Sequence, residues 1–146
     1  MFLRGVRQQI APFERAYAEG DFDALGRMCS DELVERLRAR HAAERAHDRF
    51  PDARVLQTYE VELVAMELVD DDPAMVVDVR AQRVHCVKDK FGNVVEGSPD
   101  QICTMFYFWE LRQERAGYVN TEGKWVPPRW EITDHLRRPE VLFLTV

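Results

Sequence analysis

Apolar side chains recur every three or four residues in the first third of the chain, which is the spacing of one helix face. Because proline interrupts hydrogen bonding deep in a helix, we expect the first regular helix to begin near Pro12 and to end at Gly20. Asp21 and Ser30 are typical N-cap residues, and they predict a short second helix and a longer third one. Together the predicted helices span about residues 6–49. The first helix carries one apolar stripe, formed by Val6, Ile10, Phe13 and Tyr17.

The remainder of the chain, about residues 55–134, alternates apolar and polar residues as strands with one buried face do. An acidic turn follows the first strand, and a Phe-Gly-Asn hairpin turn follows the second. A short strand is expected near Trp130, after three long ones over residues 56–69, 74–88 and 101–113. On the first long strand, alternation predicts an inner face made of Tyr59, Val61, Leu63 and Ala65.

The strand over residues 101–113 is apolar on both faces. One face carries Cys103, Met105, Tyr107, Trp109 and Leu111, and the other carries Ile102, Thr104, Phe106 and Phe108. We expect this strand at the centre of the sheet, covered on both sides. Helices followed by consecutive antiparallel strands predict a single α+β domain over residues 1–146. The helices should pack on one face of a curved, cone-shaped sheet, and an apolar tail, residues 139–146, ends the chain.

Composition narrows the class of protein. The 146 residues suffice for one domain, and no apolar run is long enough to span a bilayer. No secretory pattern opens the chain, and three scattered cysteines indicate reduced thiols, with no metal site and no cofactor. The net charge of −6 argues against binding nucleic acid through the whole surface. The acidic excess lies within residues 51–146, which suits either a basic partner or simple solubility.

No motif for phosphate binding, zinc proteolysis or serine hydrolysis is present, so no catalytic residue is assigned. An apolar cone can nevertheless raise the pKa of a carboxyl group, as in small isomerases and cyclases of this shape. That alternative needs an acid or base inside the cone. The candidates for the role are Asp78, Tyr59, Tyr107, His85 and Asp134. Alternation places Asp78 on the wet face of its strand, which argues against the alternative.

Two groups of residues are candidates for binding. Tyr107, Trp109, Trp125 and Trp130 are candidate pocket or partner-binding residues, with Trp125 held by two following prolines as a projecting anchor. Arginines are candidate contacts for RNA phosphate or lipid head groups, although interleaved glutamates also fit a solvated face. They are Arg36, Arg38, Arg40, Arg45, Arg49, Arg137 and Arg138. The neighbouring His135 suits either phosphate contact or a solvated turn.

Three segments carry a resemblance to a known family. They are VKDKFGNVVEGSPDQICTMFYFWELRQE, the GKW at residues 123–125, and AYAEGDFDALGRMCSDELVERLRAR near the start. Together they resemble the Tim-forty-four-like domain family, named for the docking subunit of the mitochondrial inner-membrane translocase. The nearest resemblance is to its branch of mitochondrial large-ribosomal-subunit protein forty-five. The resemblance implies a cone-shaped α+β fold related to nuclear transport factor two, no catalytic residues, and a mitochondrial matrix location peripheral to the inner membrane.

We therefore expect a non-enzymatic structural subunit of a mitochondrial assembly, and first of all a large-subunit mitoribosomal protein near the peptide exit. Its partners would be other protein subunits, with limited contact to rRNA or to an anionic membrane surface and no transmembrane segment. One alternative is an accessory or adaptor subunit of an inner-membrane complex such as a translocase, a respiratory complex or ATP synthase. The isomerase or cyclase described above is a further alternative.

Overall fold

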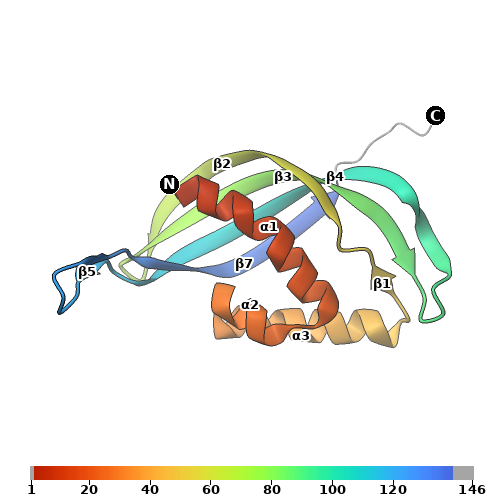
Figure 1. Cartoon of the computed structure of the whole chain (residues 1–146), viewed down its shortest axis with the longest axis horizontal. Helices are drawn as coiled ribbons and strands as arrows, with labels where there is room; N and C mark the ends of the chain where they lie inside the picture. The colour runs from red at the N-terminus through yellow and green to blue at the C-terminus, as the bar shows by residue number, and fades with distance from the viewer. Residues whose placement is uncertain (1, 140–146) are drawn as a thin grey trace.

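The computed structural model describes residues 2–139, apart from the side chains of residues 2, 59, 138 and 139. The predicted apolar tail, from residue 140 onward, lies outside this range. Three helices come first: α1 (Phe2–Glu19), α2 (Phe22–Met28) and α3 (Asp31–Ala46). Seven strands follow, and Figure 1 shows their arrangement. They are β1 (Phe50–Pro51), β2 (Val55–Val69), β3 (Asp72–Lys88), β4 (Val94–Arg115), β5 (Tyr118–Val119), β6 (Trp125–Val126) and β7 (Arg129–Pro139).

The helix boundaries follow the predicted caps, with one correction. The Asp21 carboxylate accepts a hydrogen bond from the Ala24 amide at 3.1 Å, and the Ser30 hydroxyl accepts one from the Leu33 amide at 3.3 Å. Gly20 ends α1 with a φ of 69°, which glycine adopts without strain. The expected start of α1 near Pro12 is wrong, because the helix begins at Phe2 and continues through the proline. Burial of the apolar residues that precede Pro12 offsets the single hydrogen bond that proline cannot donate.

A five-stranded antiparallel sheet forms the second layer, in the order β1-β3-β4-β7 with β2 also paired to β3. The first two predicted long strands match β2 and β3 closely. The predicted aromatic strand is the middle of β4, which also includes the arm after the hairpin turn because Gly97 lies opposite Cys86 across a bulge. A separate hairpin, β5–β6, forms in the stretch between β4 and β7. The fold is therefore the expected α+β arrangement.

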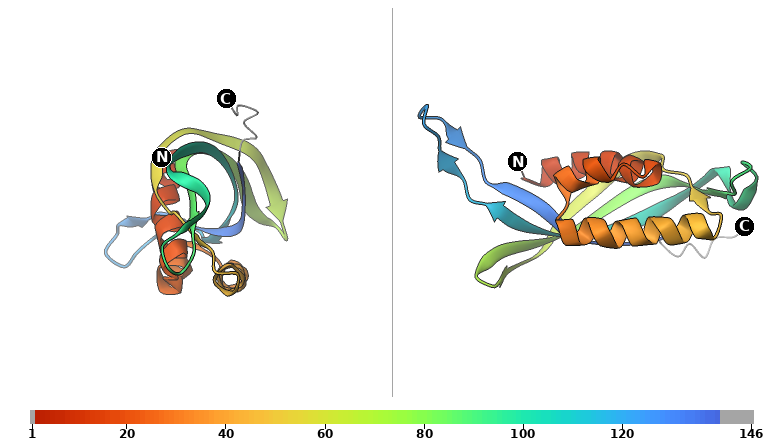
Figure 2. Two further views of the ribbon diagram at one scale, coloured as in Figure 1. Left: turned by 90° about the vertical axis from the view of Figure 1, so that its right-hand side faces the viewer. Right: turned by 90° about the horizontal axis from the view of Figure 1, so that it is seen from below.

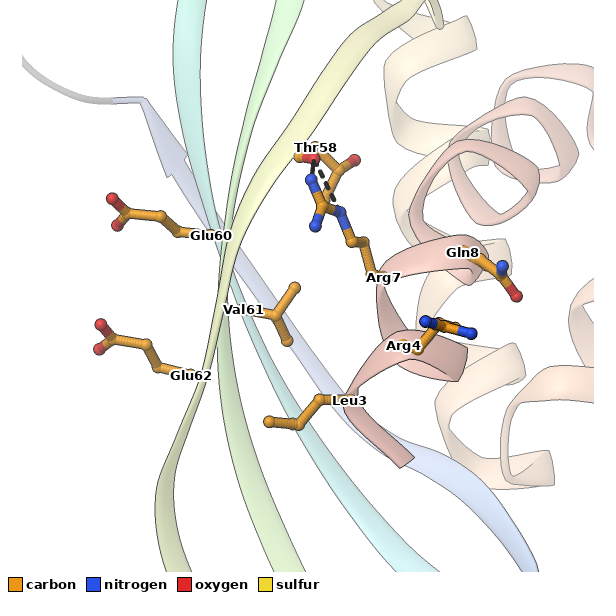
Figure 3. A pocket seen from close by; sticks show the side chains of 8 residues that line it. All are labelled: Leu3, Arg4, Arg7, Gln8, Thr58, Glu60, Val61 and Glu62. Carbon is orange, nitrogen blue, oxygen red and sulfur yellow. Dashed lines mark hydrogen bonds between the residues drawn. The ribbon is translucent and has the colours of Figure 1, made fainter. Parts of the chain in front are cut away.

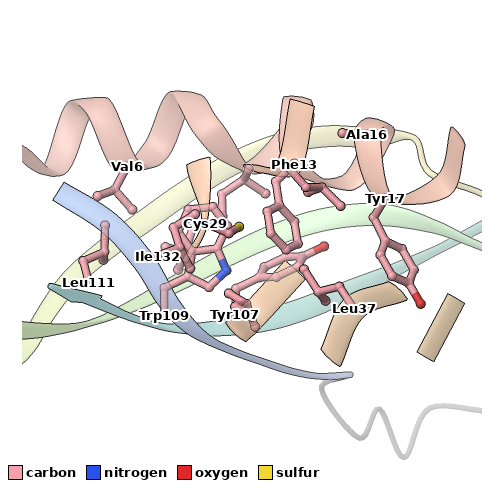
Figure 4. Close-up of a cluster of buried hydrophobic side chains, with 14 of the residues drawn as sticks. Val6, Phe13, Ala16, Tyr17, Cys29, Leu37, Tyr107, Trp109, Leu111 and Ile132 are labelled. Atoms are coloured by element: carbon pink, nitrogen blue, oxygen red, sulfur yellow. The ribbon is translucent and has the colours of Figure 1, made fainter. Parts of the chain in front are cut away.

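All three helices lie on the concave face of the sheet, as the two views in Figure 2 show. The core between the layers is dominated by three completely buried rings, those of Phe13, Tyr107 and Trp109 (Figure 4). The expectation that β4 is covered on both faces is wrong for the described residues. On the convex face Ile102 is 52% exposed, and Phe106 is half-buried under the Arg80 guanidinium, 4.8 Å from its ring centroid. Long side chains of neighbouring strands thus partly shield this face in place of a second layer of helices.

The predicted inner face of β2 is only partly correct. Val61 packs against the core, but Leu63 and Ala65 are exposed. The side chain of Tyr59 is not among those the structure describes. Leu63 is exposed because the far ends of β2 and β3 extend past the helices that cover the rest of the sheet (Figure 2). Ala65 is exposed because a bulge between Leu63 and Ala65 places it opposite Val76, on the convex face. An alternating pattern reveals neither such a bulge nor whether another layer reaches a face.

Candidate functional site

The concave face of the sheet is filled by side chains where a ligand of the predicted cone would sit. Trp109 packs its ring 5.2 Å from that of Phe13 and donates a hydrogen bond from Nε1 to Nδ1 of His135 at 2.8 Å. Tyr107 lies beside it on β4 and is completely buried. These two residues, predicted as pocket residues, are therefore brought together, but inside the packed core.

A buried polar cluster adjoins these rings. The Glu14 carboxylate on α1 accepts hydrogen bonds at 2.9 Å from Arg83 on β3 and from Arg137 on β7. Arg83 also donates to the Tyr107 hydroxyl at 3.3 Å and to the Asp52 carbonyl. Glu14 and Arg83 are both almost inaccessible to solvent. The Glu14 carboxylate thus joins α1 to β3 and β7, and Arg83 extends the cluster to β4.

The cluster sets the protonation states around it. Burial raises the pKa of Glu14, but the charges of Arg137 and Arg83 outweigh burial and hold it below its usual value. Burial together with the nearby Glu14 charge raises the pKa of Tyr107 to about 12. Burial lowers the pKa of His135 to about 3. At neutral pH Glu14 is therefore ionised, Tyr107 keeps its proton and His135 is neutral, which suits a structural role.

Sequence reasoning did not single out Glu14 or Arg83. A signal was available in both: Glu14 lies four residues after Ile10 on the apolar stripe of α1, and Arg83 continues the inward-facing series of β3. A charged residue on each of two predicted apolar faces indicates a buried pair. The expectation for His135 was wrong on both options, because it is buried against Trp109 and faces neither phosphate nor a solvated turn.

The predicted arginines do not form one patch. Arg36 pairs with Asp134 at 3.3 Å and Arg38 with Glu35 at 3.7 Å, and both arginine side chains are 53% exposed. The next three along the chain are engaged by neighbours. Arg40 donates to the Tyr17 hydroxyl, Arg45 to the carbonyls of Ala18 and Arg49, and Arg49 to Glu96. Arg137 belongs to the buried cluster, and the side chain of Arg138 lies outside the described part.

The candidates for acid–base chemistry are dispersed. Asp78 lies on the convex face of the sheet, whereas Tyr107 lies on the concave face. Asp134 pairs with Arg36, and Nε2 of His85 lies 3.5 Å from Oε2 of Glu96. Within residues 2–139 no group of three or more histidine, cysteine or acidic side chains is placed to hold a metal ion. A cavity of about 260 Å³ does open between β1, β3 and β4, but arginines and acids line it in equal number, Arg49, Arg83 and Arg137 against Glu44, Asp52 and Glu96.

An open cleft of about 900 Å³ separates the start of α1 from β2 (Figure 3). Leu3 faces Val61 across it, whereas Glu60 and Glu62 point to the other side of the sheet. Arg7 closes one end by donating from Nε to the Thr58 carbonyl at 2.9 Å. The helix therefore covers the outer edge of β2 near Thr58.

Two hairpins, β5–β6 and β2–β3, project beyond the helices (Figure 2), and both carry exposed apolar side chains. Trp125 on the β5–β6 hairpin is 63% exposed, as expected for an anchor, and Tyr118 and Val119 accompany it. On the β2–β3 hairpin Met66 is 67% and Leu68 72% exposed. Trp130 differs from Trp125, since it is half-buried against the core. Both hairpins offer accessible apolar surface of the kind that binds other proteins.

These features define an α+β domain with a filled interior and two projecting hairpins that carry exposed apolar side chains. The chain belongs to the family described as the Tim44-like domain, which it matches over residues 1–133. The resemblance seen in the sequence is thus confirmed at the level of the family, and so is the expected fold.

Several relatives are subunits of the mitochondrial import inner membrane translocase. The chain is 28% identical over 136 residues to mitochondrial import inner membrane translocase subunit TIM44-1 of Arabidopsis thaliana, covering 93% of the chain and 28% of that protein. It is 27% identical over 115 residues to the human TIM44 subunit, covering 78% and 25%. It is 28% identical over 142 residues to the Saccharomyces cerevisiae subunit, covering 93% and 32%. The chain therefore spans about a quarter to a third of these relatives. They are mitochondrial proteins of the inner membrane, in agreement with the expected location.

A solved structure shares the fold. The intermembrane space region of the chloroplast protein ARC6 superposes with a TM-score of 0.52 at 11% identity, covering 96% of this chain and 98% of that one. At this identity the likeness shows the architecture alone. None of the helices in the described part of the chain is long and apolar enough to cross a membrane.

Proposed function

We propose that this protein is a non-enzymatic docking domain of an inner-membrane protein translocase, acting on the matrix side of mitochondria. The observation that carries the proposal is the family match over residues 1–133, shared with translocase subunits. The packed concave face supports it, because rings occupy the space that a substrate would need. The apolar projections support it as well, since they supply accessible surface for protein partners.

The translocase role is preferred over the expected ribosomal one. The relatives described above are translocase subunits. In addition, a net charge of −6 disfavours broad contact with the phosphates of rRNA. An accessory role in a respiratory complex or ATP synthase has no comparable support.

Site-specific photo-crosslinking in mitochondria tests the proposal. A photoreactive phenylalanine at Trp125, on the exposed β5–β6 hairpin, is expected to capture translocase subunits. The same probe at Ala42, exposed on α3, is the control for random contacts. Co-sedimentation of the protein with the large ribosomal subunit, without crosslinks to any translocase subunit, would establish the ribosomal role and overturn the proposal.

A peripheral contact with the anionic membrane surface is a second candidate, because Arg36 and Arg38 keep more than half of their side chains exposed. Flotation with vesicles that contain cardiolipin tests it. We expect binding to weaken when both arginines are changed to Ala, because each removes one attraction to the lipid head groups. Unchanged flotation would assign membrane association to protein partners alone.

A further inference from the structure

β2 is an edge strand with a long uncovered segment. It pairs with β3 on one side, and none of the described strands pairs with its other side. Near Thr58 the edge is covered by α1 and its carbonyl is capped by Arg7. The strand then continues past the helices toward its turn with β3 (Figure 2), and Leu63, Val64, Met66 and Leu68 on this part are exposed. Unpaired backbone groups on an exposed apolar edge are a template for pairing with another strand.

The two faces of this segment differ in chemistry. The register places Leu63 opposite Val77 and Met66 opposite Met75, so these side chains lie on the same face as the core. It places Glu62 opposite Asp78 and Glu67 opposite Ala74, on the convex face. A strand added at this edge would therefore align its alternate side chains with apolar groups on one face and with carboxylates on the other.

The net negative charge of the protein is concentrated in β2 and the first half of β3. Residues 55–79 contain seven acids and no Lys, Arg or His, a net charge of −7, whereas the whole chain has −6 and the remainder therefore +1. In the described structure Glu60 is paired with Arg80 at 3.2 Å, but no ion pair forms at Glu62, Glu67 or the three aspartates of the turn. Glu62 and Asp78, two like charges, even lie directly opposite each other.

We propose that the edge of β2 from Glu62 to Val69 binds, by strand addition, an extended polypeptide segment in which Lys or Arg alternates with apolar residues. Main-chain hydrogen bonds to the free edge would supply affinity, and alternate side chains would supply selectivity. The basic side chains would lie beside Glu62 and Glu67 and offset the like charges there. The apolar ones would cover Leu63, Met66 and Leu68.

Charge decides between this partner and a second copy of the chain. Pairing two copies through β2 would bring together two stretches, residues 55–79 of each copy, with a charge of −7 each. Like charges across an interface disfavour association, and acidic side chains on an edge strand are a known protection against self-pairing. A basic segment would instead be attracted by the negative charge of this edge. The proposal needs only the geometry of β2, so it holds or fails independently of the assembly to which the protein belongs.

Titration of the purified full chain with synthetic peptides tests the proposal. The probe is a capped peptide of about eight residues in which Lys alternates with Val, the length of an ordinary strand. Two control peptides are matched to it: one with Glu in place of Lys, and one N-methylated at alternate residues so that it cannot pair with an edge. Fluorescence anisotropy gives the affinity, and amide hydrogen exchange locates the site. We expect only the first peptide to bind and to protect amides within Glu62–Val69.

Two protein variants separate the β2 edge from overall charge. Glu62→Lys with Glu67→Lys changes the net charge from −6 to −2, since each substitution adds two positive charges. Glu19→Lys with Glu122→Lys makes the same change at exposed sites elsewhere. The first pair is expected to weaken binding roughly tenfold or more, as loss and reversal of two close charge contacts does. The second pair is expected to change it about twofold at moderate salt, because distant exposed charges are screened.

Three results would overturn the proposal. If the N-methylated peptide bound as tightly as the Lys–Val peptide, the attraction would be by charge without strand addition. Both peptides are compared on the unmodified protein. Equal loss of affinity in both double variants would show that no particular edge is recognised. A dimer in sedimentation equilibrium that the Lys–Val peptide dissociates would show that the edge is occupied by a second copy of the chain.

Discussion

Replacing Glu14 by Ala removes the only carboxylate of the buried cluster and leaves two guanidinium groups facing an apolar core. Oε2 of Glu14 lies 2.9 Å from Nη1 of Arg83 and 2.9 Å from Nη1 of Arg137. Arg83 is buried and keeps only neutral partners, the Tyr107 hydroxyl and the Asp52 carbonyl. The substitution therefore creates an uncompensated buried charge, which is more costly than the loss of two hydrogen bonds.

Breaking a buried ion pair from one side costs about 3–5 kcal/mol. Arg137 retains some exposure and can turn toward water, which moves the expected loss for Glu14→Ala toward the lower end of that range. For a domain of this size 1 kcal/mol corresponds to roughly 2–4 °C in Tm, so we expect Tm to fall by roughly 6–12 °C. Glu19→Ala, on the exposed side of the same helix, is the control and should change stability by less than about 0.5 kcal/mol.

Urea unfolding followed by circular dichroism measures both variants, and the single variant Arg83→Met and the double variant Glu14→Ala with Arg83→Met complete a mutant cycle. We expect the second substitution to recover part of the loss, because it removes the unpaired charge. The pH dependence adds a separate check. Since the pKa of Glu14 is lowered in the folded state, its contribution is present at neutral pH and is lost as the pH falls through the folded value. A loss below about 1 kcal/mol for Glu14→Ala would refute the structural role of the cluster.

Three further predictions concern the core and α1. Trp109→Phe should lower the free energy of unfolding in urea by about 2–4 kcal/mol, because it leaves a cavity and removes the hydrogen-bond donor to His135. Trp125→Phe, at an exposed site, should lower it by less than about 0.5 kcal/mol. Similar losses in the two variants would contradict the core packing. The pKa of His135 is lowered to about 3, so the contribution of the neutral imidazole to stability is complete above pH 6.5 and is lost as the pH falls toward 3. An NMR titration in which this imidazole gains its proton near pH 6.5 would disprove the prediction. Pro12→Ala should raise stability by roughly 1–3 kcal/mol in thermal unfolding, since it restores a helical hydrogen bond; destabilisation would contradict a continuous α1.

Much of the fold could be predicted because its signals are local. The caps at Asp21 and Ser30 act within three residues of each helix start. Alternation similarly separated Asp78 from the inward face of β3, where Val77 and Val79 are completely buried. Where prediction failed, a local preference was overridden by burial: α1 continues through Pro12 because the residues before it contact the core. Propensity is a weak signal when tertiary packing opposes it.

The candidate site was less predictable than the fold. Trp125 and Trp109 are both aromatic residues within apolar stretches, yet one is exposed on a hairpin and the other is completely buried. Periodicity gives the face of a strand, and it gives no information on whether a helix covers that position. The uncovered edge of β2 has the same origin, because it depends on where α1 begins relative to the sheet.

The sequence by itself determined the three helices, the long strands and the family, since each depends on residues close together in the chain or on a pattern shared with relatives. The tertiary structure alone decided which apolar side chains meet the helices and which remain for a partner. It also decided that Glu14 meets Arg83 and Arg137, although 69 and 123 positions separate them in the chain. Such contacts depend on strand register and on the packing of helices over the sheet, and both are fixed only when distant segments bury their apolar faces together.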